Sequence, residues 1–289
     1  MKYLITGAGG QLGMEWVQYA QANDLSFSSY TSTELDITDE KQVAEAFRNL
    51  SPDVVINCAA YTKVDLAEKE IQKAYSVNAG GVKNLASACN KVGAKLVHFS
   101  TDYVFSGVIT DKETYPGGYP EDAGCNPINV YGESKREGEI LLQQHLSDFL
   151  LIRVSWLCGQ FGSNFVKTML RLAENRNEIS VVDDQFGSPS YAFDVVEKTD
   201  RLIKRSAIGM YHISSYGMLS WADYAEEIFR QMRLTIKVKR ISSSQYPLDA
   251  NRPAYSLLCN KKMENAGIKP LDWKDGLSQL LQQIMDEKK

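Results

Sequence analysis

The chain has 289 residues, of which 44% are hydrophobic, and it carries a formal net charge of -4. Such a length and composition predict a folded globular protein with one large domain or two modest ones. The acidic balance argues against nucleic acid as the main partner, and no apolar run reaches the roughly 18 residues that span a bilayer. We therefore expect a cytoplasmic protein with neither a nucleic-acid nor a membrane partner.

Cysteine and histidine give no sign of a metal site. The five cysteines are odd in number and scattered, at positions 58, 89, 125, 158 and 259. They show neither a disulfide framework nor metal-ligand spacing, so we expect reduced, mostly buried thiols. The three histidines, His98, His145 and His212, are isolated in the sequence. We expect no metal ion and no catalytic histidine.

The beginning of the chain predicts a dinucleotide-binding turn. Residues 2–6 read as a short buried strand, glycines follow at positions 7, 10 and 13, and residues 14–22 have helical composition. This arrangement lets the backbone approach a pyrophosphate and directs a helix N-terminus at it. Gly7 permits the tight turn, Gly10 the close approach, and Gly13 the packing of helix on strand. An ordinary glycine-rich turn is the alternative.

The end of the second strand bears on cofactor choice. We expect this strand at residues 26–30, where folds of this kind usually place an acidic residue that selects NAD. Here no acid occurs before Glu34. The absence favours NADPH as the cofactor, but no arginine lies nearby to bind a 2'-phosphate, which leaves NADH open.

Strands and helices alternate through the first hundred residues. Thr38 or Asp39 can cap a helix that ends at Leu50, and residues 53–57 form a third strand. A helical pattern covers residues 71–90, with a patch of small residues at 78–81 that suggests close contact with the sheet. Residues 94–100 are the fourth strand. The pattern predicts an α/β protein with a Rossmann-type, doubly wound parallel sheet.

Residues 131–135, with the sequence YGESK, place a tyrosine and a lysine four positions apart. On the expected helix, Tyr131 and Lys135 share one face. A nearby lysine charge favours the phenolate, so we expect Lys135 to lower the pKa of Tyr131 from its ordinary value of about 10. A surface helix pair is the simpler interpretation. Ser100 or Thr101, at the end of the fourth strand, can donate a hydrogen bond to a substrate carbonyl beside Tyr131.

The rest of the chain predicts a second, smaller lobe. Another core strand is expected at residues 150–154. Helices are expected at 164–175, 191–205, 221–232 and 272–285, with strands at 179–182, 210–214 and 235–240. We expect a dinucleotide-binding domain at residues 1–155, with a returning segment at 191–214, and an interleaved C-terminal substrate lobe at 156–289 that covers the substrate.

Several of these segments, taken in order, resemble the extended short-chain dehydrogenase/reductase family. They are the glycine turn, the strand end STDYVF at 100–105, and the spacing of Tyr131 and Lys135. Within that family, five further motifs resemble the dTDP-4-dehydrorhamnose reductases: CAAYTKVD at 58–65, NVYG at 129–132, RVSW at 153–156, NFVKTM at 164–169 and DQFGSP at 184–189. The matches extend from residue 2 to the region of Arg252.

The resemblance implies a reduction of the C4 ketone of dTDP-4-dehydro-L-rhamnose by NAD(P)H. It makes Tyr131 the proton donor, Thr101 the residue that orients the carbonyl, and Lys135 the residue that holds the nicotinamide ribose. It also implies cofactor contacts at Gly7, Gly10, Gln11, Leu12, Gly13, Asp36, Ile37, Ala59, Ala60 and Tyr61. For the nucleotide sugar it implies Tyr103, Val104, Phe105, Trp156, Asn164, Gln185 and Arg252. A homodimer is suggested by the resemblance alone.

Two other functions fit the same residues. A reductase of a different nucleotide 4-keto-6-deoxy sugar needs the same Thr101, Tyr131 and Lys135. The resemblance also extends to a non-catalytic, NADP-binding regulatory subunit of methionine adenosyltransferase, which would bind the cofactor without consuming it.

Overall fold

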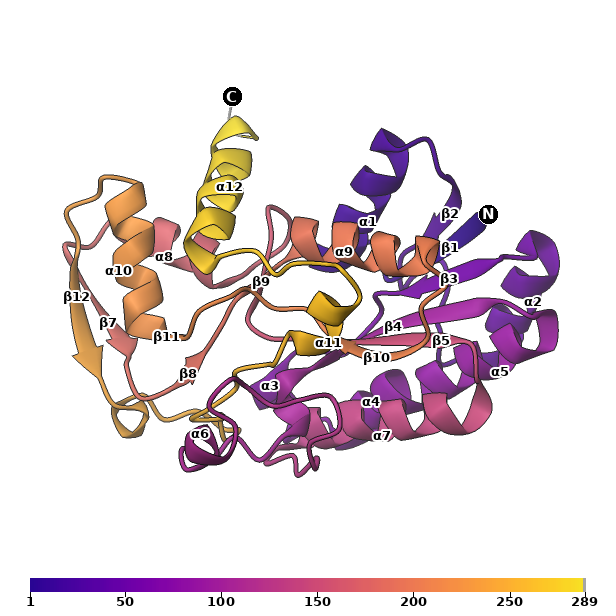
Figure 1. Cartoon of the computed structure of the whole chain (residues 1–289), viewed down its shortest axis with the longest axis horizontal. Coiled ribbons are helices and arrows are strands. Elements are labelled where there is room, and N and C mark those ends of the chain that lie inside the picture. The colour runs from indigo at the N-terminus through magenta and orange to yellow at the C-terminus, as the bar shows by residue number, and fades with distance from the viewer. Residues whose placement is uncertain (288–289) are drawn as a thin grey trace.

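The centre of the molecule is a parallel sheet. The computed structural model describes residues 1–287, and within them six strands pair in the order β10-β5-β4-β3-β1-β2 (Figure 1). Their bounds are β1 Lys2–Thr6, β2 Ser26–Tyr30, β3 Val54–Asn57, β4 Lys95–Thr101, β5 Phe149–Val154 and β10 Gly209–His212. The order changes direction between β1 and β3, and ligands bind at such switch points, beyond the carboxyl ends of the strands. The Rossmann-type sheet predicted from the sequence is confirmed.

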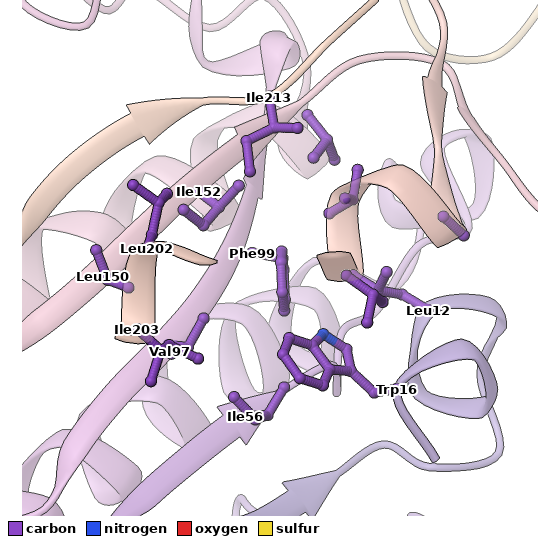
Figure 2. Packing of buried hydrophobic residues seen from close by; sticks show 14 of the residues in the cluster. Leu12, Trp16, Ile56, Val97, Phe99, Leu150, Ile152, Leu202, Ile203 and Ile213 are labelled. Atoms are coloured by element: carbon purple, nitrogen blue, oxygen red, sulfur yellow. The ribbon is translucent and has the colours of Figure 1, made fainter. Parts of the chain in front are cut away.

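Helices cover both faces of the sheet. In Figure 1, α1 (Gln11–Ala22) and α9 (Ala192–Lys204) lie over one face, while α2 (Glu40–Leu50), α5 (Val82–Val92) and α7 (Val130–His145) lie over the other. Each helix packs an apolar stripe inward, as with Val43 and Phe47 of α2, which are one turn apart and both buried. On the opposite face, Trp16 of α1 is fully buried against Ile56 and its neighbours (Figure 2).

The predicted long helix at residues 71–90 is interrupted. The structure has α4 at Ile71–Tyr75, a π-helical segment at Ser76–Gly81, and then α5. This segment lies against α7, whereas we expected its small residues to contact the sheet. A Cβ atom on Gly138 of α7 would lie 2.0 Å from the carbonyl oxygen of Asn78, so the two backbones are in direct contact there. This contact accounts for the glycine at position 138, while Gly81 of the segment packs against Ile37, where a Cβ atom would lie 2.6 Å from the Ile37 side chain.

A second core lies beyond β5. Its main elements are α8 (Phe165–Ala173), β7 (Glu178–Val182), α10 (Trp221–Gln231), β12 (Lys237–Ile241) and α12 (Trp273–Asp286), at the left of Figure 1. β7 and β12 pair in parallel, and the helices bury a cluster that includes Val166, Tyr224 and Leu280. The chain returns to the main sheet through α9 and β10, which pairs in parallel with β5.

The remaining elements are short. They are α3 Val64–Ala67, α6 Asp111–Thr114, α11 Lys261–Asn265, β6 Leu157–Cys158, β8 Phe186–Gly187, β9 Ser190–Tyr191, β11 Leu219–Ser220, and two 3-10 turns at Asp102–Val104 and Ser243–Gln245. Within residues 1–287, none of the helices has both the length and the apolar character needed to cross a membrane.

Candidate active site

Two positions in the turn between β1 and α1 accept only glycine. Gly7 has φ +68°, and a Cβ atom there would lie 2.4 Å from the backbone nitrogen of Ala59. A Cβ on Gly13 would lie 2.1 Å from the carbonyl oxygen of Gly7. Gly10 is the N-cap residue of α1 and has no side chain to accept from the first-turn amides. These amides therefore stay free to bind an anion.

A pocket of about 390 Å³ lies at this turn. Its wall combines the turn after β1, the segment after β2 and the segment after β3, beyond the carboxyl ends of these three strands. The predicted cofactor residues that line it are Gly7, Gly10, Asp36, Ile37, Ala59, Ala60 and Tyr61. The pocket therefore has the small-residue wall and the helix N-terminus that a dinucleotide requires.

Two predicted cofactor residues lie beside this pocket. Leu12 is buried in the main core with Trp16. The amide of Gln11 donates to the carbonyl oxygen of Leu157 at 3.1 Å, and its side-chain oxygen accepts from Asn164 at 2.7 Å. The side chain of Gln11 thus ties the glycine turn to the chain beyond β5.

Asn78 connects the pocket to α7. Its side-chain oxygen accepts from the backbone nitrogen of Tyr61 at 2.8 Å, and its amide donates to the carbonyl oxygen of Tyr61 and to the hydroxyl of Ser134, both at 3.0 Å. Asn78 is fully buried. Because Ser134 lies between Tyr131 and Lys135, this contact fixes the catalytic candidates relative to the pocket wall.

The phenol of Tyr131 lies beside the end of β4. Asn129 caps α7 by accepting from the backbone nitrogen of Gly132 at 2.8 Å, which places Tyr131 in the first turn of the helix. The Thr101 hydroxyl lies near enough to the phenol to lower its pKa. Thr101 and Tyr131 therefore lie near each other, and the Thr101 hydroxyl donates to Asp102 at 3.1 Å.

Lys135 is held by the backbone of β4. Its Nζ donates to the carbonyl oxygen of Phe99 at 2.6 Å and lies 3.4 Å from Nε2 of His98. Burial raises the pKa of Tyr131 to about 12, a shift that the Thr101 hydroxyl partly opposes and the Asp102 carboxylate adds to. Our prediction that Lys135 lowers this pKa is therefore wrong for this arrangement, because desolvation of the phenol dominates.

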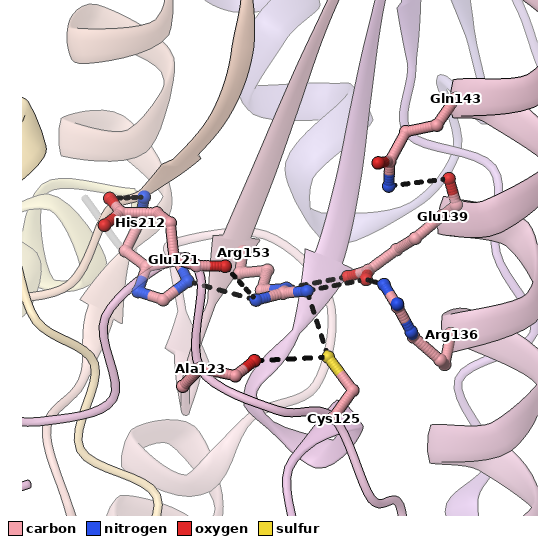
Figure 3. A network of polar contacts seen from close by, with 8 residues as sticks. All are labelled: Glu121, Ala123, Cys125, Arg136, Glu139, Gln143, Arg153 and His212. Carbon is pink, nitrogen blue, oxygen red and sulfur yellow. Dashed lines mark hydrogen bonds and ion pairs between the residues drawn. The ribbon is translucent and has the colours of Figure 1, made fainter.

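A buried ion pair holds α7 against the sheet. Arg153 of β5 donates to both carboxylate oxygens of Glu139, at 2.8 and 2.7 Å, and Arg136 adds a third bond at 2.9 Å (Figure 3). Burial alone would raise the pKa of Glu139, but its hydrogen bonds and the charge of Arg153 bring the pKa below its ordinary value. Glu139 lies one turn after Lys135, so this pair fixes the helix at the site.

Arg252 is held in place by a carboxylate. Its Nη2 donates to Asp65 of α3 at 2.5 Å, and its guanidinium lies over the ring of Tyr103, 5.9 Å from the centroid. The Tyr103 ring contacts Tyr131 edge to face, with the centroids 5.6 Å apart. Nη1 of Arg252 is buried and has no hydrogen-bond partner within residues 1–287. The structure thus brings Arg252 and Tyr103 to the site.

Two of the residues predicted to contact the sugar belong to the core instead. Val104 and Phe105 are both fully buried, and the Phe105 ring stacks on Tyr119 with a centroid separation of 4.2 Å. Their side chains therefore face packed protein, and we correct both assignments to structural roles.

The other three sugar-binding candidates come from the part of the chain beyond β5. Trp156 stacks on Trp221 with the ring centroids 3.6 Å apart, so one face of its indole is covered by protein. Asn164 caps α8 and contacts Gln11, while Gln185 is half-buried before β8. Trp156 also has φ +46°, an uncommon backbone conformation for a bulky residue.

Nearly the whole chain matches a family model. The model is described as the RmlD substrate binding domain, and the match covers residues 1–285. The chain belongs to this family.

Curated members of this family are similar over nearly the full length. The spore coat polysaccharide biosynthesis protein SpsK of Bacillus subtilis is 41% identical, covering 98% of this chain and 97% of the relative. A dTDP-4-dehydrorhamnose reductase of Aggregatibacter actinomycetemcomitans is 39% identical, with 96% and 98% covered.

A solved structure of a family member shows the same fold. The dTDP-4-dehydrorhamnose reductase of Bacillus anthracis, in complex with NADP, superimposes with a TM-score of 0.93 at 40% identity, covering 98% of this chain and 99% of that one. A UDP-glucose 4-epimerase of Thermus thermophilus, in complex with NAD, has a TM-score of 0.84 at 20% identity, with 99% of both chains covered. This second likeness concerns the fold alone.

Sequence reasoning missed several residues of the site. Thr31 and Ser32 line the pocket where we looked for an acidic residue, and Asn78 bonds both Tyr61 and α7. The sequence contained a signal for the first two, because they directly follow the second strand. It contained none for Asn78, whose role depends on a tertiary contact.

Proposed function

We propose that this protein is a dTDP-4-dehydrorhamnose reductase, which reduces the C4 ketone of dTDP-4-dehydro-L-rhamnose to dTDP-L-rhamnose in nucleotide-sugar and polysaccharide biosynthesis. The observation that carries this proposal is the meeting of Thr101 and Tyr131 at the end of β4, with Lys135 one turn further on. The full-length relatives named dTDP-4-dehydrorhamnose reductase support the choice of substrate.

Each catalytic residue has a separate task. A bound reduced nicotinamide supplies the hydride that the carbonyl carbon accepts. Tyr131 donates a proton to the carbonyl oxygen, and the Thr101 hydroxyl orients that oxygen. With a pKa of about 12, the phenol carries its proton at neutral pH and is available as a donor. Lys135 is one helical turn from Tyr131, where it can hold the nicotinamide ribose.

The cofactor of this proposal is NADPH, with NADH as the alternative. The neighbour from Bacillus anthracis in complex with NADP supports NADPH. The hydroxyls of Thr31 and Ser32 line the pocket at the end of β2, where an acidic side chain would repel a 2'-phosphate. Glu34 lies close by and accepts from the backbone nitrogen of Thr31 at 2.8 Å, so its charge works against that preference.

We propose the substrate contacts from the positions of the predicted sugar-binding residues in the structure. Arg252 would bind the diphosphate through its free Nη1, since a guanidinium matches phosphate oxygens. Tyr103, Trp156, Asn164 and Gln185 would contact the sugar and the base. We further propose the division into residues 1–155 and 156–289, a cytoplasmic location and a homodimer, all of which stay predictions.

The test is the loss of reduced-nicotinamide absorbance with dTDP-4-dehydro-L-rhamnose, run with NADPH and with NADH. Rapid oxidation with a lower Michaelis constant for NADPH is the expected result. Faster turnover of another nucleotide 4-keto-6-deoxy sugar would reassign the substrate. Binding of both cofactors without oxidation would contradict a reductase and favour a regulatory subunit.

A further inference from the structure

A buried line of polar side chains connects Lys135 to the middle of the sheet. The hydroxyl of Thr6 on β1 donates to Oδ1 of Asn57 on β3 at 2.8 Å, and Nδ2 of Asn57 lies 3.0 Å from Nδ1 of His98 on β4. Nε2 of His98 then lies 3.4 Å from Nζ of Lys135. All four residues are at most 2% exposed. Each polar contact in this line therefore has to be made within the protein.

The orientation of the Asn57 amide follows from a backbone donor. The backbone nitrogen of Ala59 lies 3.1 Å from Oδ1 of Asn57. A backbone N–H can only donate, so the atom facing Ala59 has to be the amide oxygen. The NH₂ group of Asn57 consequently faces Nδ1 of His98 and donates to it.

This donor fixes the tautomer of His98. Burial and the nearby Lys135 charge hold the pKa of His98 well below its ordinary value, so the ring is neutral and carries one proton. Because Nδ1 accepts from Asn57, that proton is on Nε2. His98 therefore presents an N–H donor to Nζ of Lys135.

The other groups around Lys135 have opposing effects on its pKa. The carbonyl oxygen of Phe99 accepts from Nζ, and the Glu139 charge, already paired with Arg153, raises the pKa of Lys135. Burial outweighs this effect and lowers that pKa to about 8. The thiol of Cys58, from the segment after β3, stays neutral because burial raises its pKa. Tyr131, one turn earlier on the same helix, has a phenol that is protonated at neutral pH.

We propose that Asn57 and His98 are positioning residues for Lys135: through the fixed tautomer of His98, they direct an N–H donor at Nζ. An N–H donor repels an ammonium and bonds to a neutral amine, so Lys135 releases its proton more readily than a lysine surrounded by acceptors. This inference rests on the proposed function, because it assumes that Lys135 belongs to a reductase site. It assigns a role to a histidine for which the sequence predicted none.

The tautomer can be measured without cofactor or substrate. The chain contains three histidines, so ¹⁵N-histidine labelling and two-bond ¹H–¹⁵N spectra can separate them, with His98→Gln assigning the signal of His98. The expected result is an Nε2–H tautomer for His98 that persists across neutral pH. An Nδ1–H tautomer, or a ring that protonates near pH 6.5, would overturn the proposal.

The effect on Lys135 can be measured by cofactor binding. Asn57→Asp replaces the amide by a carboxylate, which accepts from Nδ1–H and so reverses the tautomer. We expect the pH midpoint of NADPH binding to rise by about one unit, a tenfold change in proton affinity. Lys135→Met should abolish this titration, which identifies its source.

A double-mutant comparison separates the tautomer from the added charge. If the carboxylate acts through His98, the shift caused by Asn57→Asp should largely disappear in a His98→Phe background. An equal shift in both backgrounds would mean that the charge acts directly and would overturn the proposal. Neither experiment uses the keto sugar, so either can fail while the proposed reductase activity stands.

Discussion

Tyr131 combines a protonated phenol with a half-buried position in the first turn of α7, beside the end of β4. Burial is the largest cause of its raised pKa, and the charges of Lys135 and Arg252 are directed at Phe99 and Asp65 respectively. A phenol in this environment is a proton donor at neutral pH and a poor base. The direction of proton transfer in the proposed reduction agrees with this state.

Removing the Tyr131 hydroxyl should affect turnover far more than binding. Tyr131→Phe leaves the ring in place and removes the proton, so kcat should fall by about 10²- to 10⁴-fold. The dissociation constant for NADPH, measured by fluorescence, should change little. The matched control is Tyr75→Phe. It removes a hydroxyl of α4 that donates to Glu133, a residue of the same helix α7 as Tyr131. Near-normal turnover of Tyr131→Phe would contradict its role as the acid.

Asp102 should make stability depend on pH. It is 3% exposed, accepts from the Thr101 hydroxyl at 3.1 Å, and burial raises its pKa to about 7. The folded protein therefore holds this proton more tightly than the unfolded chain, so stability is lost as pH rises from about 4 to 7. Asp102→Asn should raise the free energy of unfolding at pH 8 by up to about 4 kcal/mol, and by less at pH 5. Equal changes in urea unfolding at the two pH values would contradict this expectation.

At the scale of elements, α7 depends on close contact with the π-helical segment before α5. The sequence predicted most strands and helices, because their apolar residues recur with the period of each structure. It did not predict the interruption of the helix at residues 71–90, since the local sequence is helical throughout. The change of geometry accompanies the contact between Asn78 and α7, which joins segments about sixty residues apart.

This contact can be tested with two glycines. An alanine Cβ at Gly138 would lie 2.0 Å from the carbonyl oxygen of Asn78, so Gly138→Ala should destabilise the protein by about 1–3 kcal/mol. At Gly80 the nearest atom would be 4.0 Å away, and Gly80→Ala should be neutral or slightly stabilising. Urea unfolding compares the two variants. Equal changes in the free energy of unfolding for the two variants would show that the close approach of Gly138 to Asn78 does not constrain the packing of α7.

At the scale of the whole molecule, polar networks join parts that the sequence shows only as separate motifs. Arg153 was predicted as part of a core strand. In the structure it bonds Glu139 on α7 and the carbonyl oxygen of Glu121, and it lies 3.5 Å from His212 on β10 (Figure 3). Motif spacing predicted the glycine turn, and the family resemblance implied a role for Thr101 beside Tyr131. Motif spacing could not predict partners that meet only when distant strands pair.

Breaking the buried pair should destabilise the whole fold. Glu139→Gln leaves Arg153 buried without its counter-charge, at an expected cost of about 3–5 kcal/mol in the free energy of unfolding. The matched control is Glu178→Gln, which removes one partner of an exposed pair with Lys237 and should have little effect. Thermal and urea unfolding measure both. A small effect for Glu139→Gln would mean that α7 is held mainly by its apolar contacts.

The most direct test of the central claim follows the hydride itself. The protein is incubated with dTDP-4-dehydro-L-rhamnose and NADPH that carries deuterium at both C4 positions, and the product is analysed by NMR and mass spectrometry. The account predicts dTDP-L-rhamnose with one deuterium at C4 of the sugar, and almost none when Tyr131→Phe replaces the wild-type protein. Oxidation of NADPH without deuterium at that carbon, or no product at all, would contradict it.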